Sequence, residues 1–437
     1  MNAAGLGCGL AVTVIPLQDE ETYGIYIAND FGEWIHPNEF LVLKDDDTFE
    51  DRAIQYNMDI QMYGMGIAPG DYDNDLDLDL YITNLGENYL LQNNDSIYDP
   101  VQNSLNIDNI NTPDGRLTTG WGTFFLDADN NSDLDLFVAN GTVNSPEFIG
   151  GSFNDPNILF IRNNNGNFVQ TPESFGIYKE GPNLNRGAAK GDIDNDGDED
   201  IVVSYINFSP TTDLDKQYSV FENNFDQKSY VDIFLEGTIS SRNPFGSQVI
   251  LYSDDNQFLN YLYSGGTHVS QNSIALHFGL NDIEKIDSVK VIWPNFTEEV
   301  FLDIPINQRI LLTENTGLVD VLGCTELEND LYNPLATINA GCAQTTVSTE
   351  DVDADDQFDI RYAQDNNELL ITSFIDDITH VSIYDATGRM IHHSREIELI
   401  KGSTTSINVE NNLLSGMYIV VLDIRRHSTF SEKIIIH

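Results

Sequence analysis

The sequence predicts an all-β protein, and three observations support this fold class. Short apolar strands alternate with aspartate-rich loops through the first 225 residues, longer alternating strands follow from Tyr230, and a third set of alternating strands closes the chain. Alternation with a period of two places successive side chains on opposite faces of a strand. With 437 residues, the chain has room for two to four domains with proper cores.

The most informative stretch is Gly191–Asp200, in which every second residue is an aspartate. In an ordinary strand these carboxylates would line one face and repel one another. A loop wrapped around Ca²⁺, which takes six to eight oxygen ligands, removes the repulsion, and Gly197 stands where such a loop turns sharply. An EF-hand would need glutamate at the twelfth loop position, which is Val203. We therefore expect a different, nine-residue loop that runs directly into a strand.

This loop is one of three copies, at Asp71–Asp79, Asp127–Asp135 and Asp192–Asp200. Each copy is preceded by a glycine-rich strand and followed by two more strands, the last of which ends in Asn-Asn. The expected first strands are Gly64–Gly70, Gly120–Leu126 and Gly187–Gly191, and the expected third strands are Tyr89–Asn94, Ile158–Asn164 and Val220–Asn224.

A fourth copy without a metal loop precedes these three. Ile25–Asn29 matches Leu80–Asn84, whereas the five acidic positions are replaced by Pro16, Gln18, Glu20, Thr22 and Gly24. The match makes Ala3–Ile15 a strand of the repeat rather than a signal peptide, and no positive residue comes before Lys44.

Repeated units of three or four short strands cannot bury both faces alone, and radial stacking into a propeller is the usual solution. The loops resemble the FG-GAP/VCBS repeats of integrin-type propellers, and most closely those of the cartilage acidic protein family. The resemblance implies a partial integrin-type β-propeller with about four blades in residues 1–225. Because about seven blades are usual for such propellers, we expect an N-terminally truncated form of a longer secreted protein; unusual closure is the alternative.

The same resemblance implies the metal ligands. Loop positions one, three, five and nine would supply side-chain oxygens to Ca²⁺, and position seven a backbone carbonyl. The side-chain ligands would be Asp71, Asp73, Asp75, Asp79, Asp127, Asp129, Asn131, Asp135, Asp192, Asp194, Asp196 and Asp200, and the carbonyls would come from Asp77, Asp133 and Asp198. Asn131 carries no charge, and Leu76 and Ser132 occupy the turn position that suits Gly197 best, so we expect affinity to fall from the third site to the first to the second.

Residues 230–315 read as a small β domain. Asn243–Ser247, Leu276–Leu280 and Val289–Pro294 occur in an order that resembles the ASPIC/UnbV domain, which follows the propeller in cartilage acidic protein relatives. Trp293-Pro294 is expected to end a strand, because proline cannot donate to a ladder.

The remaining chain divides into three parts. Residues 320–345 form a spacer framed by Cys324 and Cys342, which resembles one in secreted Bacteroidota proteins and makes a local disulfide plausible in an oxidising environment. Residues 346–360 are an acidic linker. Residues 361–437 form a terminal β-sandwich whose Tyr384–Arg389 and Leu414–Tyr418 motifs look like the type IX secretion sorting domain; an ordinary sandwich is the alternative.

Charge excludes nucleic acid as a partner, because 71 acidic residues give a net charge of −51 that would repel phosphates. No apolar run is long enough to span a membrane. Cys8, in an apolar run, is expected to be buried.

Catalytic motifs are scarce: there is no Gly-x-Ser-x-Gly elbow, P-loop or HExxH sequence. We therefore predict no catalytic and no organic-cofactor residues. His392 and His393 are expected on a solvated strand edge, and His268 and His277 in structural roles. Tyr81, Trp121, Phe137 and Tyr205 are expected to pack between blades, with a sugar-binding platform as the alternative.

Together with the calcium loops, these resemblances imply a calcium-stabilised protein that is secreted or lies on the exterior of a Bacteroidota outer membrane. It would bind a glycan or protein ligand in adhesion and would be exported by the type IX machinery. The alternative is a polysaccharide-processing enzyme with its site in the propeller channel or in a missing N-terminal region.

Overall fold

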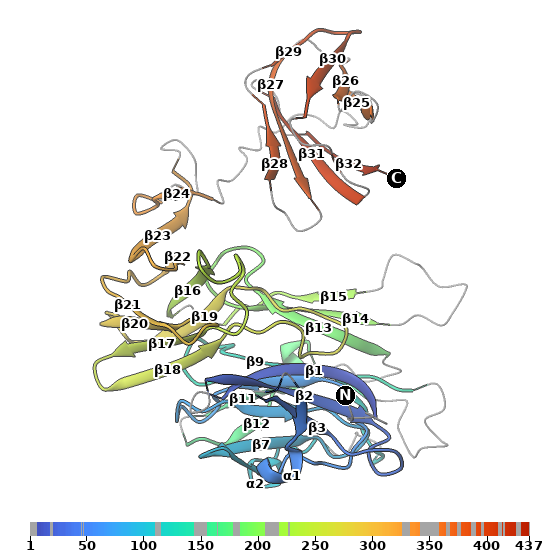
Figure 1. Cartoon of the computed structure of the whole chain (residues 1–437), viewed down its shortest axis with the longest axis vertical. Helices are drawn as coiled ribbons and strands as arrows, with labels where there is room; N and C mark the ends of the chain where they lie inside the picture. The colour runs from blue at the N-terminus through green and yellow to red at the C-terminus, as the bar shows by residue number, and fades with distance from the viewer. Residues whose placement is uncertain are drawn as a thin grey trace. The chain divides into compact units, whose positions relative to one another are not determined.

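The computed structural model places most of the chain. The residues that it describes are 7–17, 21–44, 46, 48–109, 115–143, 155–163, 165–177, 184–205, 218–225, 228–325, 333–340, 358–363, 368–373, 377–385, 390–394, 397–409, 413, 416–424 and 430–436. The chain forms two compact units, Met1–Leu322 and Gly323–His437, which are described separately (Figure 1). Strands dominate both, which confirms the all-β prediction.

Among the described residues up to Phe221, the strands form four antiparallel sheets in chain order. The first has the order β1-β2-β3-β4, the second β5-β6-β7-β8, the third β9-β10-β11-β12 and the fourth β13-β14-β15. The strands are β1 (Cys8–Leu17), β2 (Thr22–Asp30), β3 (Glu39–Leu43), β4 (Phe49–Asp51), β5 (Ile67–Gly70), β6 (Asp79–Ile82), β7 (Tyr89–Asn94), β8 (Ile97–Pro100), β9 (Gly120–Leu126), β10 (Asp135–Asn140), β11 (Ile158–Arg162), β12 (Phe168–Gln170), β13 (Asn185–Gly191), β14 (Asp200–Tyr205) and β15 (Tyr218–Phe221).

The helices in the described part are single turns between these strands. They are α1 (Ala53–Tyr56), α2 (Gln102–Leu105) and the 3-10 turn η2 (Glu173–Phe175). Asn57 and Asn106 end α1 and α2 in the left-handed conformation, which asparagine tolerates better than most residues.

Three hydrophobic cores lie between neighbouring sheets. The first joins Tyr26 of the first sheet to Leu80 and Ile82 of the second, the next joins Tyr81 to the third sheet, and the last joins Phe137 to the fourth. Each sheet therefore packs on the next one in chain order, which is the burial that the repeat pattern predicted.

Eight further strands complete the first unit and form two more sheets. One has the order β19-β16-β22-β23, in which β16 and β22 are parallel, and the other has the antiparallel order β18-β17-β20-β21. The strands are β16 (Ser229–Glu236), β17 (Gln248–Ser253), β18 (Asn256–Tyr261), β19 (Leu276–Asn281), β20 (Ser288–Ile292), β21 (Glu298–Phe301), β22 (Gln308–Thr313) and β23 (Leu318–Gly323). Their shared core surrounds the fully buried Trp293, and β20 ends just before Trp293-Pro294 as predicted.

Residues Tyr261–Ser273, here called the crossing segment, run over the first strand of each of the four sheets. Tyr261 Oη donates to Val14 O of β1 at 2.8 Å, and Ile67 N of β5 donates to Gly266 O at 2.9 Å. Thr267 Oγ1 accepts from Thr123 N of β9 at 3.2 Å and donates to Ala188 O of β13 at 3.1 Å. The β-strand edges of the repeat region are thereby tied to the region that follows it.

The second unit contains two sheets around one core. Their orders are β25-β26-β30 and β28-β27-β31-β32, with β29 paired to β27. The strands of these sheets are β25 (Phe358–Ala363), β26 (Glu368–Ser373), β27 (Asp377–Asp385), β28 (Met390–His393), β29 (Ile397–Leu399), β30 (Thr404–Asn408), β31 (Gly416–Ile424) and β32 (Phe430–Ile436); the two-residue β24 (Ile338–Asn339) belongs to neither sheet. Residues 346–357, with 386–389 and 414–415 of the sorting-type motifs, lie outside the described residues.

The cysteines give one correction. Cys8 is an exposed free thiol, so the prediction of a buried Cys8 was wrong: β1 is the edge strand of its sheet and Cys8 is its first residue. Cys324 is buried and disulfide-bonded, whereas Cys342 lies outside the described residues.

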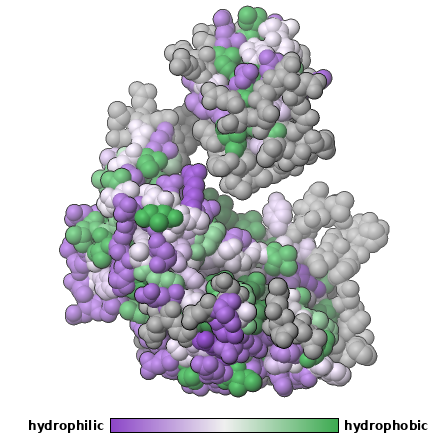
Figure 2. Space-filling view, in the orientation of Figure 1, coloured by the Kyte–Doolittle hydropathy of each residue, from purple (hydrophilic) through white to green (hydrophobic). Residues whose placement is uncertain are grey.

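Much of the coloured surface is hydrophilic, in keeping with the acidic composition (Figure 2). Over the part of the chain that the structure places, no helix has the length and apolar character needed to cross a membrane.

Candidate metal centres

Each aspartate-rich loop brings three carboxylates together, at loop positions one, three and nine. In each loop one oxygen from each of the three lies within 4.8 Å of the others. The groups are Asp71, Asp73 and Asp79; Asp127, Asp129 and Asp135; and Asp192, Asp194 and Asp200. The carboxylate at position nine is buried in all three loops. Because three carboxylate oxygens lie this close together, each group could hold a metal ion.

The carboxylate at position one organises the loop. Its two oxygens accept the backbone N–H groups of positions five and six in all three copies. The donors are Asp75 and Leu76 to Asp71 (both 3.0 Å), Asn131 and Ser132 to Asp127 (2.9 and 2.7 Å), and Asp196 and Gly197 to Asp192 (both 3.2 Å). The loop therefore wraps around this residue.

The carboxylate at position nine ties the loop to the sheet. One oxygen accepts the N–H of position two, and the other accepts an N–H from the third strand of the sheet or from the residues just after it. The donors are Tyr72 and Asn93 to Asp79 (3.2 and 2.8 Å), Ala128 and Arg162 to Asp135 (2.9 and 2.7 Å), and Ile193 and Asn223 to Asp200 (2.9 and 2.8 Å). Position nine is thus also a structural residue.

The side chains at position five lie outside the groups of three. Asp75, Asn131 and Asp196 each use one oxygen to accept the N–H of position seven, at 2.9, 2.7 and 3.2 Å. At position seven, the Asp133 side chain contacts Arg162 at 2.5 Å, whereas the carboxyl of Asp198 is buried. The sequence had assigned Asp198 only a carbonyl role.

Two backbone positions in each loop are left-handed. Position six has φ of 72° at Leu76, 76° at Ser132 and 96° at Gly197, which confirms that this is the turn position that glycine suits. Position four is also left-handed, and the sequence reasoning missed it. The signal was present, because position four is asparagine in every loop: Asn74, Asn130 and Asn195 have φ of 60°, 51° and 64°.

Three buried carboxylate oxygens in these loops have no hydrogen-bond partner among the described residues: Asp73 Oδ1, Asp129 Oδ1 and Asp198 Oδ1. A buried carboxylate oxygen without a hydrogen bond is costly, and a cation would supply a partner; the other oxygen of Asp73 accepts from Gln92 Nε2 at 2.5 Å. The first two atoms belong to position three, which the groups of three already place beside positions one and nine.

Burial also shifts the protonation of the loops. Desolvation raises the pKa of Asp71 to about 7, of Asp79 to about 9 and of Asp127 to about 7, and that of Asp135 well above its ordinary value. Without a cation, these carboxyl groups would therefore share protons near neutral pH. A divalent ion would take the place of the protons.

The third loop differs from the other two. Its position three, Asp194, is exposed, and burial raises the pKa of Asp192 only to about 6. Gly197 at its turn lies against an aromatic ring: a Cβ at this position would be 2.0 Å from Tyr230 Cε1. At position one, therefore, the third loop gives up its proton more easily than the other two loops, although burial also raises the pKa of its Asp198 to about 8, and glycine makes its turn the least strained.

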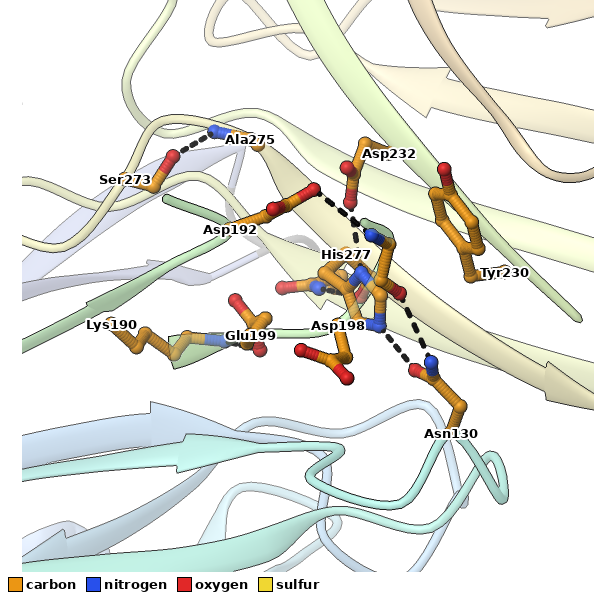
Figure 3. A network of polar contacts seen from close by, with 12 residues as sticks. Asn130, Lys190, Asp192, Asp198, Glu199, Tyr230, Asp232, Ser273, Ala275 and His277 are labelled. Carbon is orange, nitrogen blue, oxygen red and sulfur yellow. Dashed lines mark hydrogen bonds and ion pairs between the residues drawn. The ribbon is translucent and has the colours of Figure 1, made fainter. Parts of the chain in front are cut away.

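A buried histidine joins the second and third loops to the region that follows the repeats (Figure 3). His277 of β19 contacts Asp232 Oδ1 of β16 through Nδ1 at 2.8 Å and Asn130 Oδ1 through Nε2 at 2.6 Å. Asn130 Nδ2 donates to Gly197 O at 3.0 Å. Burial lowers the pKa of His277, but the hydrogen bond and charge of Asp232, with the charges of Glu199 and Asp127, outweigh it and raise the pKa to about 9. His277 is thus a charged structural histidine.

Beside this network, Lys190 and Glu199 form an ion pair of 2.8 Å that is also drawn in Figure 3. On the β19 side, Gly279 allows close approach to the second loop, because a Cβ there would lie 2.0 Å from Asp127 Oδ2. The Leu276–Leu280 motif therefore packs directly on the second aspartate-rich loop.

The other singled-out residues are mostly structural. Tyr81 and Phe137 are fully buried between sheets, which excludes them from a sugar platform, and Trp121 Nε1 donates to Gly141 O at 2.7 Å. His268 Nδ1 lies 3.0 Å from Met65 O, and its pKa is lowered, chiefly by burial. Tyr205 is partly buried at the end of β14. His392 and His393 lie on β28, an edge strand as expected; His393 is exposed, whereas His392 is half-buried and its Nε2 is shielded from solvent, so the expectation of a solvated side chain was wrong for His392.

Two segments match family models. Residues 237–319 match the family described as ASPIC and UnbV, which confirms the resemblance stated for that region. Residues 347–436 match a domain of unknown function (DUF8694). Each match covers less than half of the chain. A search of the curated proteins found no match.

Three solved structures show distant similarity to this chain. The structure of PorZ, described as an essential bacterial surface component of the type-IX secretion system of Porphyromonas gingivalis, is 13% identical, with a TM-score of 0.23; the match covers 95% of this chain and 58% of PorZ. The CD2-binding domain of CD58 is 13% identical over 47% of this chain and 98% of its own (TM-score 0.14). The central fibronectin-III array of RIM-binding protein is 8% identical over 85% and 97% (TM-score 0.13).

Proposed function

We propose that this chain is a secreted calcium-binding β-propeller protein that acts in extracellular binding or adhesion. The observation that carries the calcium assignment is the threefold repetition of one loop, with the same three carboxylates grouped and the same backbone donors on positions one and nine. The buried Oδ1 atoms of Asp73 and Asp129, which have no hydrogen-bond partner among the described residues, support it, because a cation bound there would supply the missing interaction.

Calcium suits the donor set better than other metals. The candidate ligands are carboxylates and one amide, and hard oxygen donors favour Ca²⁺, Mg²⁺ or Mn²⁺ over the softer metals that prefer cysteine or histidine. Mg²⁺ demands near-ideal octahedral geometry and keeps several waters, whereas Ca²⁺ accepts irregular shells of six to eight oxygens. A nine-residue loop that supplies most ligands itself favours calcium.

The proposed role of the ions is structural. Position nine already joins each loop to its sheet, so an ion on positions one, three and nine would close the loop onto the sheet. At ten times its Kd, one ion adds roughly 1.4 kcal/mol to the free energy of unfolding. Three such ions matter against a total stability of about 5–15 kcal/mol.

The test is calorimetric titration of the chelated full chain with CaCl₂, with thermal unfolding in calcium and in EDTA. We expect binding of three ions and a marked fall in Tm in EDTA. The variant Asp129→Asn should lose one ion, and the exposed control Asp255→Asn should lose none. An unchanged Tm in EDTA would defeat the structural role.

Four stacked sheets support the propeller assignment. Their first strands β1, β5, β9 and β13 contact one another in chain order, and successive sheets share cores. Radial stacking of such sheets gives a propeller with its first strands innermost. On this arrangement the crossing segment lies on the innermost strand edges, where the enzyme alternative would place its site.

A glycan or protein ligand would then bind at loops rather than in the channel. A glycan array beside a hydrolysis assay on the same polysaccharides separates binding from catalysis. Binding without turnover supports the proposal, and reducing ends that accumulate with time support the enzyme alternative.

Export by type IX secretion is proposed for residues 361–437 on the motif resemblance alone. A reporter protein fused to these residues should reach the surface of a Bacteroidota strain with an intact type IX system. It should remain inside an otherwise identical strain that lacks the system. Secretion from both strains would contradict the sorting role.

A further inference from the structure

The asparagine at position four of each aspartate-rich loop contacts a residue outside its own loop. Position four lies between two proposed ligands, has a left-handed backbone and is asparagine in all three copies. The contacts are those of Asn74 Nδ2 with Asp133 Oδ1 (3.4 Å), of Asn130 Nδ2 with Gly197 O (3.0 Å) and of Asn195 Oδ1 with Arg309 Nη1. The first loop is thereby joined to the second, the second to the third, and the third to β22.

The contact between the second and third loops is the most completely buried of the three. Asn130 is only 3% exposed, whereas Asn74 is partly buried and Asn195 is exposed. Both ends of the Asn130 amide are engaged, and its backbone O accepts Asn281 N at 2.9 Å (Figure 3). Because a buried polar group that loses its partner is costly, the Asn130 side chain is held in this one orientation.

His277 decides which end of the Asn130 amide faces the third loop. Nδ1 of His277 faces Asp232 Oδ1 at 2.8 Å, and Nε2 faces Asn130 Oδ1 at 2.6 Å. A carboxylate and an amide oxygen only accept hydrogen bonds, so both ring nitrogens donate. The amide nitrogen of Asn130 is then directed at Gly197 O, and His277 is a positioning residue for this contact.

The two ends of the Asn130–Gly197 hydrogen bond belong to two different candidate metal centres. Asn130 lies between positions three and five of the second loop, which would both supply side-chain ligands. Gly197 lies between positions five and seven of the third loop, which would supply a side chain and a carbonyl. A cation in either loop would therefore fix the backbone that carries one end of this hydrogen bond.

We propose that the second and third loops bind calcium with positive cooperativity, transmitted by the Asn130–Gly197 hydrogen bond. The inference rests on the proposed calcium sites. The first ion to bind orders its own end of the hydrogen bond, which lowers the entropy cost of ordering the other loop. Coupling between two sites is reciprocal, so each ion should raise the affinity for the other by the same factor, at least about fivefold.

The first and second loops should be coupled more weakly. The contact between Asn74 and Asp133 is 3.4 Å long, beyond the usual range of a hydrogen bond, and Asp133 Oδ1 also contacts Arg162 at 2.5 Å. Calcium in the first loop should therefore change the affinity of the second loop less than calcium in the third loop does.

The test is calorimetric titration of three full-chain samples with CaCl₂. Asp73→Asn disables the first loop and leaves the second and third; adding Asp194→Asn leaves only the second, and adding Asp129→Asn leaves only the third. We expect the overall association constant for two ions in the first sample to exceed the product of the two single-site constants at least about fivefold.

Asn130→Gly in all three samples tests the hydrogen bond itself. Glycine tolerates the left-handed φ of 51° and keeps every charge, so only the side chain is lost, and the excess over the product should disappear. Asn106→Gly is the matched control, because Asn106 ends α2 outside the loops with a φ of 59° and should leave the excess unchanged. Near-UV circular dichroism checks that each variant is folded.

The outcomes separate coupling from a structural role of Asn130 and from the proposed function. A structural role alone would weaken the single sites and leave the excess unchanged in Asn130→Gly, which overturns the proposal. An overall constant equal to the product of the single-site constants also overturns it, while the calcium assignment stands. Samples that bind no calcium defeat the calcium assignment and the coupling together.

Discussion

The Nε2 atom of His277 lies 2.6 Å from Oδ1 of Asn130, although the two residues are 147 positions apart. Asn130 is the left-handed fourth residue of the second aspartate-rich loop, and it also donates to Gly197 O in the third loop. One imidazole therefore connects the ASPIC/UnbV-matching region to two candidate metal centres (Figure 3). We therefore expect a substitution of His277 to perturb both candidate metal centres.

Replacing His277 should be strongly destabilising. His277→Leu leaves the buried carboxylate of Asp232 without its partner, a loss that costs about 3–5 kcal/mol. Urea denaturation in calcium measures it. The double variant Asp232→Asn/His277→Leu should recover part of the loss because the uncompensated charge is gone. A loss below about 1 kcal/mol in the single variant would show that the pair is not important for stability.

The same pair should give a pH dependence. The pKa of His277 is raised from 6.5 to about 9 in the folded chain, so its contribution is fully present below pH 6.5 and is lost as the pH rises through about 9. The difference in unfolding free energy between the parent and His277→Leu should therefore shrink from pH 6.5 to pH 10. Measurement in EDTA keeps calcium away from Asp127, whose negative charge helps to raise the pKa of His277. A difference that stays constant over this range would contradict the charged state of His277.

The local geometry of the loops could be predicted from the sequence, but their contacts with distant parts of the chain could not. The aspartate spacing located Asp71, Asp73 and Asp79 correctly as neighbours, because a nine-residue loop fixes these distances by itself. The partners of His277 could not be predicted, since they come from β16 and from a loop far away in sequence. The crossing segment has no periodic pattern, and its contacts with β1, β5, β9 and β13 depend on the packing of the whole unit.

Ser132→Gly should stabilise the chain. Ser132 holds a φ of 76° that costs a non-glycine residue roughly 1–2 kcal/mol, and its buried Oγ has no partner in the described residues. Thermal and urea unfolding should both show the gain, and calcium affinity at the second loop should rise with it. Ser132→Ala is the matched control: it removes the hydroxyl but keeps the Cβ, so it should give only part of the gain. Equal effects of the two variants would count against backbone strain.

Gly197→Ala should have the opposite effect. Its φ of 96° is strained for alanine, which costs about 1–3 kcal/mol, and the new Cβ would meet the Tyr230 ring. Gly317→Ala separates the two causes, because Gly317 has a φ of 66° and no atom within 4 Å of the added Cβ. We expect Gly197→Ala to lose clearly more unfolding free energy than Gly317→Ala. Similar losses would mean that Tyr230 moves aside without cost.

The three sites should bind calcium in the order third, first, second. Asp192, with a pKa of about 6, is ionised at pH 7, whereas Asp71 and Asp127, at about 7, hold protons that calcium must displace. Two further features should weaken calcium binding by the second loop: Asn131 is neutral, and Ser132 holds a strained backbone conformation. Three double variants, each combining two of the substitutions Asp73→Asn, Asp129→Asn and Asp194→Asn, disable two loops at a time. Each double variant leaves one intact site whose calcium affinity calorimetry can measure. We expect at least about a tenfold range of Kd between the third and second sites at pH 7. The range should narrow as the pH rises toward 9, because the protons on Asp127 are then lost before calcium arrives. A tightest second site, or a range that widens with pH, would refute this order.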